Sequence, residues 1–210
     1  GIVDCHISDL ESLVRSGIIK VIGNKVSGNM AQKSINNKVV QQTIKDKDTI
    51  NPTDHTQNKD LKTGLEPWVG EDPKVLILGS LPGDESIKQQ TYYAKKQNAF
   101  WKIMRTLFDN NIETDNKKFI ISCGIALWDC VHSAIRKGSL DSAIKDDTVV
   151  ANDIKGLIAK YPTINTIIFN GGKAEEHYKK YCKDIDCETI RLISTSPAAT
   201  KVFEEKLKEW

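Results

Sequence analysis

The sequence predicts an α/β domain of three layers, in which a central four-stranded parallel sheet lies between two layers of helices. Four short apolar segments with strand character alternate with segments of helical periodicity in the last two thirds of the chain. The first of them, Lys74-Val75-Leu76-Ile77-Leu78, has no polar alternation, which is typical of a strand covered on both faces. Because strands separated by helices pair in parallel, the alternation indicates a parallel sheet with helices on both sides.

The expected elements follow one another in a regular order. The expected strands are 74–78, 124–128, 166–169 and 189–193. The expected helices are 98–108, about 116–123, 152–160, 173–181 and about 200–210. Glycine or polar residues follow every strand, and in a parallel sheet the carboxyl ends of the strands border the ligand site. The sequence therefore predicts a site formed by 79–83, Asp129, 170–172 and 194–197.

Length and composition limit the class of protein. The chain has 210 residues, of which 39% are hydrophobic and 28% charged, enough for one domain with a core and a small additional segment. No apolar run approaches the roughly 18 residues that a membrane span needs. The net charge of +2 neither excludes nucleic acid as a partner nor argues for it, so any basic surface must be local.

The first 64 residues differ from the rest. Residues 9–14 suggest a short helix and 18–26 a hairpin, whereas 27–62 are rich in Asn, Gln, Lys, Thr and Asp. We therefore expect an N-terminal extension over 1–64, with a polar linker, and the main domain over 65–210.

The number and spacing of the cysteines indicate the redox state of the cellular compartment. Five are present and none forms a CxxC pair, which argues against a secreted disulfide framework. We expect an intracellular protein, cytoplasmic if the source is prokaryotic. An iron–sulfur cluster held by Cys123, Cys130, Cys182 and Cys187 is the less favoured alternative. The four histidines, His6, His55, His132 and His177, show no metal-ligand spacing, and we expect no metal and no cofactor.

An ordered set of short motifs marks the strand ends. The first loop is Gly79-Ser80-Leu81-Pro82-Gly83, and Asn98-Ala99-Phe100-Trp101 follows it. Later motifs are Leu127-Trp128-Asp129, Gly138-Ser139-Leu140-Asp141, Phe169-Asn170-Gly171 and Ser194-Thr195-Ser196-Pro197. In this order they resemble the uracil-DNA glycosylase superfamily, closest to the hypoxanthine-DNA (deoxyinosine) glycosylase family and related to the mismatch-specific uracil and thymine glycosylases. The resemblance covers about 65–210.

The resemblance implies a monofunctional DNA glycosylase with a uracil-DNA glycosylase-like fold. Such an enzyme hydrolyses the N-glycosidic bond of a deaminated base in DNA, here hypoxanthine first, with uracil or xanthine as further substrates. Its partner is DNA that contains the deaminated base. We expect the protein to be a monomer and to have no membrane partner. The alternative is a module with the same fold that binds DNA or a base without cutting.

Three positions depart from the family pattern. The mismatch enzymes have a water-activating Asn where this chain has Leu81, which cannot orient water. The family commonly has His-Pro-Arg before Asn98, where this chain has Lys95-Lys96-Gln97. The last motif commonly continues Pro-Ala-Asn, whereas this chain has Ala199 at its end. The departures bear on substrate range and rate and leave the predicted fold unchanged.

The expected catalytic residue is Asn98, since an amide can orient water and bind a base; its alternative role is a helix cap. By resemblance, Tyr93 stacks on the extruded base, and its alternative role is a core position. The other expected base-binding residues are Gly79, Ser80, Pro82, Gly83, Asp129 and Asn170. Asp129 and Asn170 have polar groups suited to a base edge, although a cap, a salt bridge or a turn would also explain them.

The expected DNA-binding residues are Ser194, Thr195, Ser196, Pro197, Ala198, Lys95 and Lys96. Hydroxyl and backbone N–H groups beside a proline suit DNA phosphates, and the residues after Pro197 would form a small wedge in the duplex. Asp84 and Glu85 could activate water or simply favour a helix start. An unrelated hydrolase or nucleotide-binding enzyme finds no support, because neither a Gly-x-Ser-x-Gly nor a Gly-x-Gly-x-x-Gly motif occurs.

Overall fold

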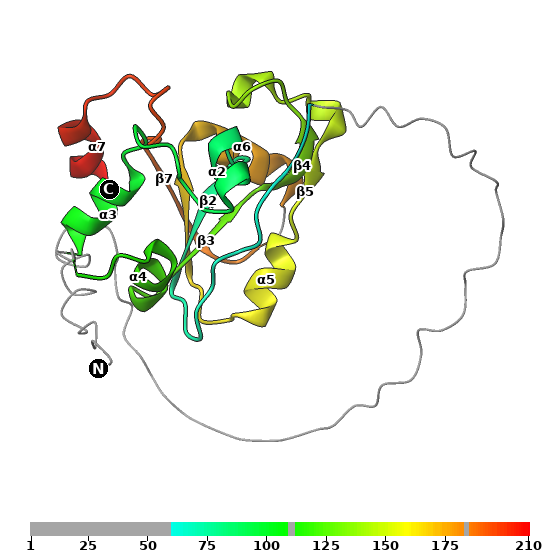
Figure 1. Cartoon of the computed structure of the whole chain (residues 1–210). Helices are drawn as coiled ribbons and strands as arrows, with labels where there is room; N and C mark the ends of the chain where they lie inside the picture. Colours follow the sequence, from blue (N-terminus) through cyan, green and yellow to red (C-terminus); the bar gives the residue numbers. More distant parts are fainter. Residues whose placement is uncertain (1–59, 109–111, 183–184) are drawn as a thin grey trace, which may run out of the picture.

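The computed structural model describes residues 60–108, 112–182 and 185–210, and a four-stranded parallel sheet lies at its centre (Figure 1). The strand order is β3-β2-β6-β7, and all neighbouring strands run parallel. The strands are β2 (Val75–Gly79), β3 (Ile125–Asp129), β6 (Thr166–Asn170) and β7 (Glu188–Leu192). The predicted parallel sheet is confirmed, and each predicted strand lies within one residue of the observed one. The expectations for residues 1–59 fall outside the described residues.

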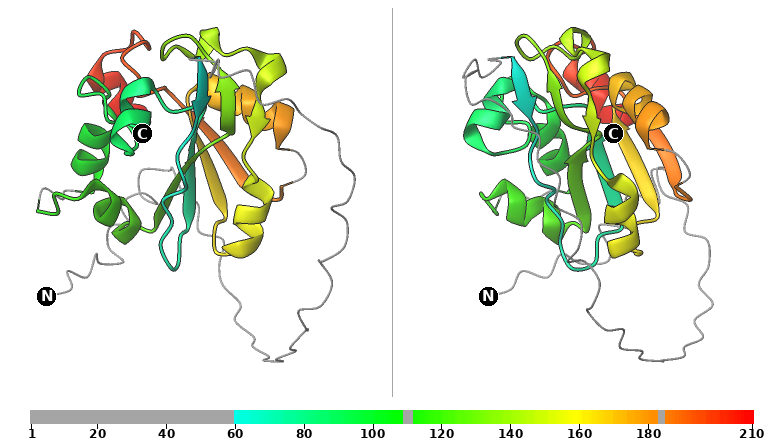
Figure 2. Two further views of the ribbon diagram at one scale, coloured as in Figure 1. Left: turned by 45° about the vertical axis from the view of Figure 1, so that its right-hand side comes forward. Right: turned by 90° about the vertical axis from the view of Figure 1, so that its right-hand side faces the viewer.

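Helices cover both faces of this sheet, as Figures 1 and 2 show. One face packs against α3 (Phe100–Leu107), α4 (Asn116–Ser122) and α7 (Phe203–Glu209). The other packs against α5 (Ile154–Lys160) and α6 (Gly172–Tyr181). The side chains of β2 alternate between the two cores, which explains why the strand is apolar throughout. The expected three-layer α/β/α arrangement is therefore present.

A second, antiparallel sheet was not expected from the sequence. It has the order β1-β4-β5, with β1 (Leu61–Thr63), β4 (Val131–Ile135) and β5 (Val150–Ala151). Only Cys130 separates β3 from β4, so one continuous segment passes from the parallel sheet into the antiparallel one. Because β1 pairs with β4, residues before the expected domain start at 65 belong to the same folded unit.

Three predicted helices begin later than expected. Helix α5 begins at Ile154 because the carboxylate of Asp153 accepts a hydrogen bond from the Gly156 N–H at 2.8 Å and caps the first turn. Helix α3 begins at Phe100 and α7 at Phe203. Short helical turns not included in the expected list are α2 (Asp84–Gln89), η1 (Asp141–Ala143) and η2 (Asp146–Thr148).

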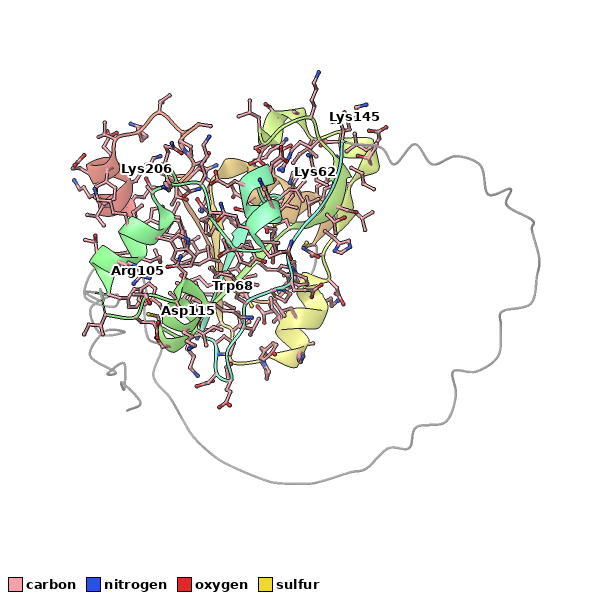
Figure 3. The ribbon with its side chains drawn as sticks, viewed as in Figure 1. Lys62, Trp68, Arg105, Asp115, Lys145 and Lys206 are labelled. Carbon is pink, nitrogen blue, oxygen red and sulfur yellow. The ribbon has the colours of Figure 1, made fainter. Side chains whose placement is uncertain are left out.

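Side-chain hydrogen bonds of Arg105, labelled in Figure 3, hold α3 against α4. Arg105 of α3 donates to the Glu113 carbonyl at 2.6 Å and to Asn116 Oδ1 at 2.7 Å, which joins α3 to α4. Trp68 is buried in the same core. None of the helices in the described ranges is both long and apolar enough to cross a membrane.

Candidate active site

The carboxyl edge of the parallel sheet forms the floor of a cavity of about 620 Å³. The register places Gly79 beside Asp129 and Asn170 beside Leu192, so the loops after the four strands meet there. Of the residues expected from the sequence, the lining contains Gly79, Ser80, Pro82, Gly83, Tyr93, Lys95, Asn98, Asp129, Asn170 and Ser194–Ala198. Lys96, also expected, is exposed and does not line the cavity.

Asp129 ends β3 at the floor of the cavity. Its side chain is 4% exposed, and its Oδ2 has no hydrogen-bond partner among the described residues. A Cβ on residue 79 would collide with Asp129 Oδ1, so only glycine at this position leaves room for the carboxyl group. Burial and, second, the charge of the nearby Asp141 raise the pKa of Asp129 to about 8, against the opposing effect of Arg136.

Tyr92 and Tyr93 both line the cavity, and Tyr92 belongs to the core as well. Tyr92 is buried, and its Oη donates to the Glu66 carbonyl at 3.0 Å. Tyr93 lines the cavity with φ of +54°, and one face of its ring stacks on Phe100 at 3.9 Å between centroids. Its Oη is buried without a partner among the described residues, and it lies near the same edge of Gly79 as Asp129.

Asn98 lines the cavity directly before α3. Its Oδ1 accepts a hydrogen bond from the Phe100 N–H at 3.0 Å, although the N-cap position of α3 itself is occupied by Ala99. The described residues provide no hydrogen bond for its Nδ2. The amide nitrogen therefore stays available to a water molecule or a ligand while the oxygen holds the helix.

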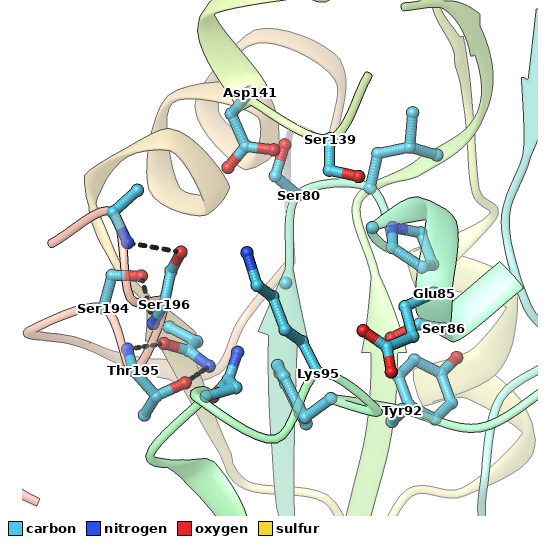
Figure 4. Close-up of a pocket in the computed structure, with 18 of the residues that line it drawn as sticks. Ser80, Glu85, Ser86, Tyr92, Lys95, Ser139, Asp141, Ser194, Thr195 and Ser196 are labelled. Carbon is cyan, nitrogen blue, oxygen red and sulfur yellow. Dashed lines mark hydrogen bonds between the residues drawn. The ribbon is translucent and has the colours of Figure 1, made fainter. Parts of the chain in front are cut away.

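Ser80 joins the floor to α6. Its Oγ lies 3.0 Å from Nδ1 of His177, and the His177 ring is fully buried. Burial lowers the pKa of His177, which favours the neutral ring. Asp141 lies on the other side of Ser80; burial raises the pKa of its carboxyl group, and Arg136 and Ser80 oppose the rise. Ser80 thus lies between His177 and Asp141 at the cavity wall (Figure 4).

Arg136 organises the first loop and was missed from the sequence. Its guanidinium, which has no exposed area, donates to the carbonyls of Leu81 at 2.9 Å, of Gly138 at 2.9 Å and of Pro82. It thereby joins the first loop to the turn that begins at Gly138. In the sequence Arg136 stands in a polar stretch next to Lys137, where a solvated side chain is the ordinary expectation.

The turn held by Arg136 adds three further residues to the wall. Ser139, Leu140 and Asp141 line the cavity, and Ser139 Oγ accepts from the Asp84 N–H at 2.9 Å. The motif Gly138-Ser139-Leu140-Asp141 was the available signal, although it was not assigned to the site. Leu81, the departure in the first loop, also lines the cavity, and it is buried against Val131, Ala134 and Ile144.

The loop 194–198 is braced from within. Asn170 donates from Nδ2 to Thr195 Oγ1 at 2.9 Å and accepts from the Thr195 N–H at 2.8 Å (Figure 4). Thr195 has no exposed area, so it braces the loop and offers no hydroxyl to a phosphate in this arrangement. Ser194 Oγ accepts from the Ser196 N–H, and Ser196 Oγ accepts from the Ala198 N–H, each at 3.2 Å.

Helix α7 holds the same loop from behind, a contact that the sequence did not reveal. Lys206 is 4% exposed, and its Nζ donates to the Ser196 carbonyl at 2.9 Å and to the Ala199 carbonyl at 3.1 Å. Burial lowers the pKa of Lys206. Trp210 Nε1 donates to the Ile193 carbonyl at 2.8 Å. The end of β7 is thus fixed to the C-terminal helix at several backbone groups.

The charges around the cavity are unevenly distributed. Asp84, Glu85, Asp129 and Asp141 line one part of the wall, next to the first loop and η1. The opposite part is formed by the hydroxyl-rich loop 194–198. Lys95 extends into the space between them (Figure 4). Among the described residues, no group of three or more His, Cys, Asp or Glu side chains is arranged to hold a metal ion.

Known proteins share this architecture. A solution NMR structure from Methanosarcina acetivorans, named as a candidate uracil DNA glycosylase, has a TM-score of 0.59 and 35% identity and covers 70% of this chain and 94% of its own. A protein of that organism named hypoxanthine DNA glycosylase is 35% identical over 154 residues, 71% of this chain and 96% of the relative. One with the same name from Methanosarcina barkeri is 31% identical over 153 residues, 71% and 95% of the two chains.

The match to a family extends from just after the first β-strand to the last residue. The family model of the uracil DNA glycosylase superfamily matches residues 67–210. This range includes all four strands of the parallel sheet and every loop that borders the cavity. Together with the two relatives and the shared fold, it establishes that the chain belongs to the uracil DNA glycosylase superfamily.

Proposed function

We propose that this chain is a monofunctional DNA glycosylase that hydrolyses the N-glycosidic bond of a deaminated base, hypoxanthine first and uracil or xanthine second. The family membership and the relatives named hypoxanthine DNA glycosylase support the reaction class. The observation that carries the proposal is the cavity of about 620 Å³ at the carboxyl edge of the sheet, a size suited to a single nucleotide.

The reaction needs three things from the cavity. Breaking the bond develops positive charge on the sugar and negative charge on the departing base, so water must reach the sugar while the base is held. Tyr93 offers the ring face that Phe100 does not cover as a stacking surface for the base. Asn98 directs its free Nδ2 at the water or the base, while its Oδ1 keeps the amide in one orientation.

The acidic part of the wall and the hydroxyl-rich loop have different tasks in this proposal. Carboxylates repel phosphates, so the sugar and base lie on the side of Asp84 and Glu85 and the DNA backbone lies along 194–198. Ser194, Ser196 and the backbone of the loop bind phosphate, with Lys95 as a cation nearby. Pro197 and Ala198 enter the duplex. Thr195 is excluded from these contacts because it is buried.

A second candidate function is a non-catalytic reader of modified DNA. Leu81 is buried in an apolar cluster, and the side-chain oxygen of Asn98 already accepts a hydrogen bond from the Phe100 N–H. These two observations favour the reader, because together they reduce the polar groups that can orient water. Such a protein would bind inosine-containing duplexes without releasing the base.

Base release from short labelled duplexes with one inosine, uracil or xanthine distinguishes the two candidates. The informative variants of Asn98 are Asn98→Ser, which keeps a cap oxygen but loses the amide, and Asn98→Ala, which loses both. We expect wild type to release hypoxanthine and Asn98→Ser to lose about 10²–10³-fold in single-turnover rate at an unchanged melting temperature. Equal rates in Asn98→Ser and wild type would leave Asn98 as a cap and move water activation elsewhere.

Retained binding without release from any substrate would decide for the reader. The monofunctional assignment has its own check, because a lyase would form an imine between a lysine and the abasic sugar. Borohydride trapping with wild type and Lys95→Gln is expected to give no covalent adduct. An adduct that Lys95→Gln abolishes would instead make this chain a bifunctional enzyme.

A further inference from the structure

Asp129 is the most deeply buried carboxyl group at the cavity floor, and the mechanism above gives it no chemical step. Its side chain is 4% exposed, and Oδ2 is without a hydrogen-bond partner in the described part of the chain. A buried polar atom without a partner costs roughly 1–3 kcal/mol, so such an atom in the wall of a cavity gains free energy when a ligand provides the partner. Asp129 lines the cavity in which the base would lie.

The backbone gives this carboxyl group its position. Gly79 pairs with Asp129 in the register of β2 and β3, and its missing Cβ leaves the space that Asp129 Oδ1 occupies. Tyr93 Oη lies within 4 Å of the same point. A base stacked on the Tyr93 ring would therefore turn one edge toward Asp129.

The surroundings of Asp129 favour its neutral form. Burial raises its pKa to about 8, so the carboxyl group keeps its proton at neutral pH. The one guanidinium close to it among the described residues, that of Arg136, is engaged with three backbone carbonyls. The titratable groups that face Asp129 are Arg136, Asp141, Tyr92, Tyr93 and Cys130. Apart from Arg136, these neighbours are acidic or neutral and oppose ionisation of Asp129.

We propose that Asp129, as a neutral carboxylic acid, donates a hydrogen bond to the exocyclic oxygen of the departing base and so selects oxo-bases in the transition state. This inference rests on the proposed function. As the N-glycosidic bond breaks, its electron pair goes to the base and charge spreads to that oxygen. The hydrogen bond from Asp129 therefore strengthens as the reaction proceeds, which accelerates the chemical step.

The same contact distinguishes a deaminated base from the amino base that it derives from. Deamination replaces an exocyclic amino group with a carbonyl oxygen, in hypoxanthine relative to adenine and in uracil relative to cytosine. The oxygen accepts the proton of Asp129, whereas an amino group only donates and leaves that proton unpaired. Once Asp129 ionises, its carboxylate repels the developing negative charge, so the selected reaction slows above the pKa of the group.

Single-turnover release of hypoxanthine from pH 6 to 9.5 tests the proposal. We expect the wild-type rate to fall with a midpoint near pH 8 and Asp129→Asn to show no such fall, since its amide still donates but does not titrate. Asp129→Ala is expected to lose about 10- to 100-fold at pH 7, the value of one hydrogen bond to a charged group. Ionisation of the inosine base contributes equally to all profiles and cancels in the comparison.

Asp141→Asn is the matched control, because Asp141 also lines the cavity and burial also raises its pKa. It is expected to keep an alkaline fall, which Asp129→Asn loses, with a midpoint moved to lower pH because the Asp141 charge helps to raise the pKa of Asp129. Affinity for a duplex with non-hydrolysable 2′-fluoroarabino-inosine is measured beside the rates and should change less than about threefold in Asp129→Asn, as expected of a contact that forms mainly in the transition state.

The outcomes separate this inference from the proposed function. Release by wild type with an alkaline fall that persists in Asp129→Asn, or with a rate that rises with pH, overturns the role of Asp129 and leaves the glycosylase in place. Absence of release by wild type from every substrate removes the proposed function, and the role of Asp129 with it. Asp129→Asn, which is nearly isosteric, keeps the test valid if Asp129→Ala does not fold.

Discussion

The floor of the cavity and the loop 194–198 differ in how they treat their polar groups. At the floor, Asp129 Oδ2 and Tyr93 Oη have no partners in the described structure. In the loop, Thr195 has two hydrogen bonds to Asn170, and Lys206 holds two carbonyls from behind. One region retains unused hydrogen-bonding capacity, and the other satisfies its own.

This difference teaches which region specifies a ligand and which one fixes a shape. Unpaired buried groups destabilise the fold and gain their partners only when a ligand arrives, so the floor suits recognition of a base edge. A braced loop loses little conformational entropy on binding, so it suits a repetitive phosphate backbone. The predictions below change one region at a time, in order of the expected effect.

The largest effect is expected for Arg136→Met. The substitution leaves the buried carbonyls of Leu81 and Pro82 without their donor, so we expect a loss of roughly 3–5 kcal/mol in the free energy of unfolding. Urea denaturation measures it. Arg191→Met is the control, since Arg191 is 61% exposed in its ion pair with Glu175, and we expect less than about 1 kcal/mol there. Equal losses in the two variants would mean that Arg136 does not support the floor.

Asp129→Asn is expected to stabilise the protein at alkaline pH. A carboxyl group whose pKa is higher in the folded than in the unfolded state binds its proton more tightly when folded, so its ionisation opposes folding. This cost is absent below the unfolded value of 3.8 and grows until the pH passes about 8. We expect the stability advantage of Asp129→Asn over wild type to be largest at pH 8 and to decrease progressively toward pH 4. A constant difference between pH 4 and pH 8 would contradict a raised pKa.

Asn170→Ala is expected to destabilise the loop 194–198. It removes both hydrogen bonds to Thr195 and leaves a buried N–H unpaired, so we expect a loss of about 1–2 kcal/mol in stability. Affinity for an undamaged duplex should fall with it, because the loop becomes less ordered. Asn170→Asp, which can still accept from the Thr195 N–H, should recover most of the stability. If Asn170→Ala binds the undamaged duplex with wild-type affinity, Asn170 does not contribute to DNA binding.

The smallest effect is expected for Lys206→Met. Methionine fills the space of the buried stem, and the loss of two hydrogen bonds is partly offset because an ammonium group no longer has to be desolvated. We expect about 1 kcal/mol or less in stability, and a two- to fivefold weaker duplex affinity in a fluorescence anisotropy titration. Exposed Lys208→Met serves as the charge control. If both variants weaken binding equally, the effect is one of net charge and not of loop position.

The parallel sheet could be predicted from the sequence because the strands are covered on both faces, so that they are short continuous apolar runs, such as β2, followed by glycine or polar residues. The antiparallel sheet could not be predicted, because β1 has only three residues and β5 two, and β4 follows β3 with no turn signal. The loops of the site were found from their motifs. Arg136 and Lys206 were not, since their partners are backbone carbonyls, which leave no mark in a sequence.

The stack of Tyr93 on Phe100 has a spectroscopic consequence. Trp101 lies next to both rings, at 6.3 Å from Tyr93 and 4.9 Å from Phe100 between centroids, and its Nε1 donates to the Tyr92 carbonyl at 2.9 Å. The indole is therefore coupled to the Tyr93 ring, on which a base would stack. Occupancy of the cavity should change the intrinsic tryptophan emission of the protein, which gives a label-free signal for nucleotide entry in real time.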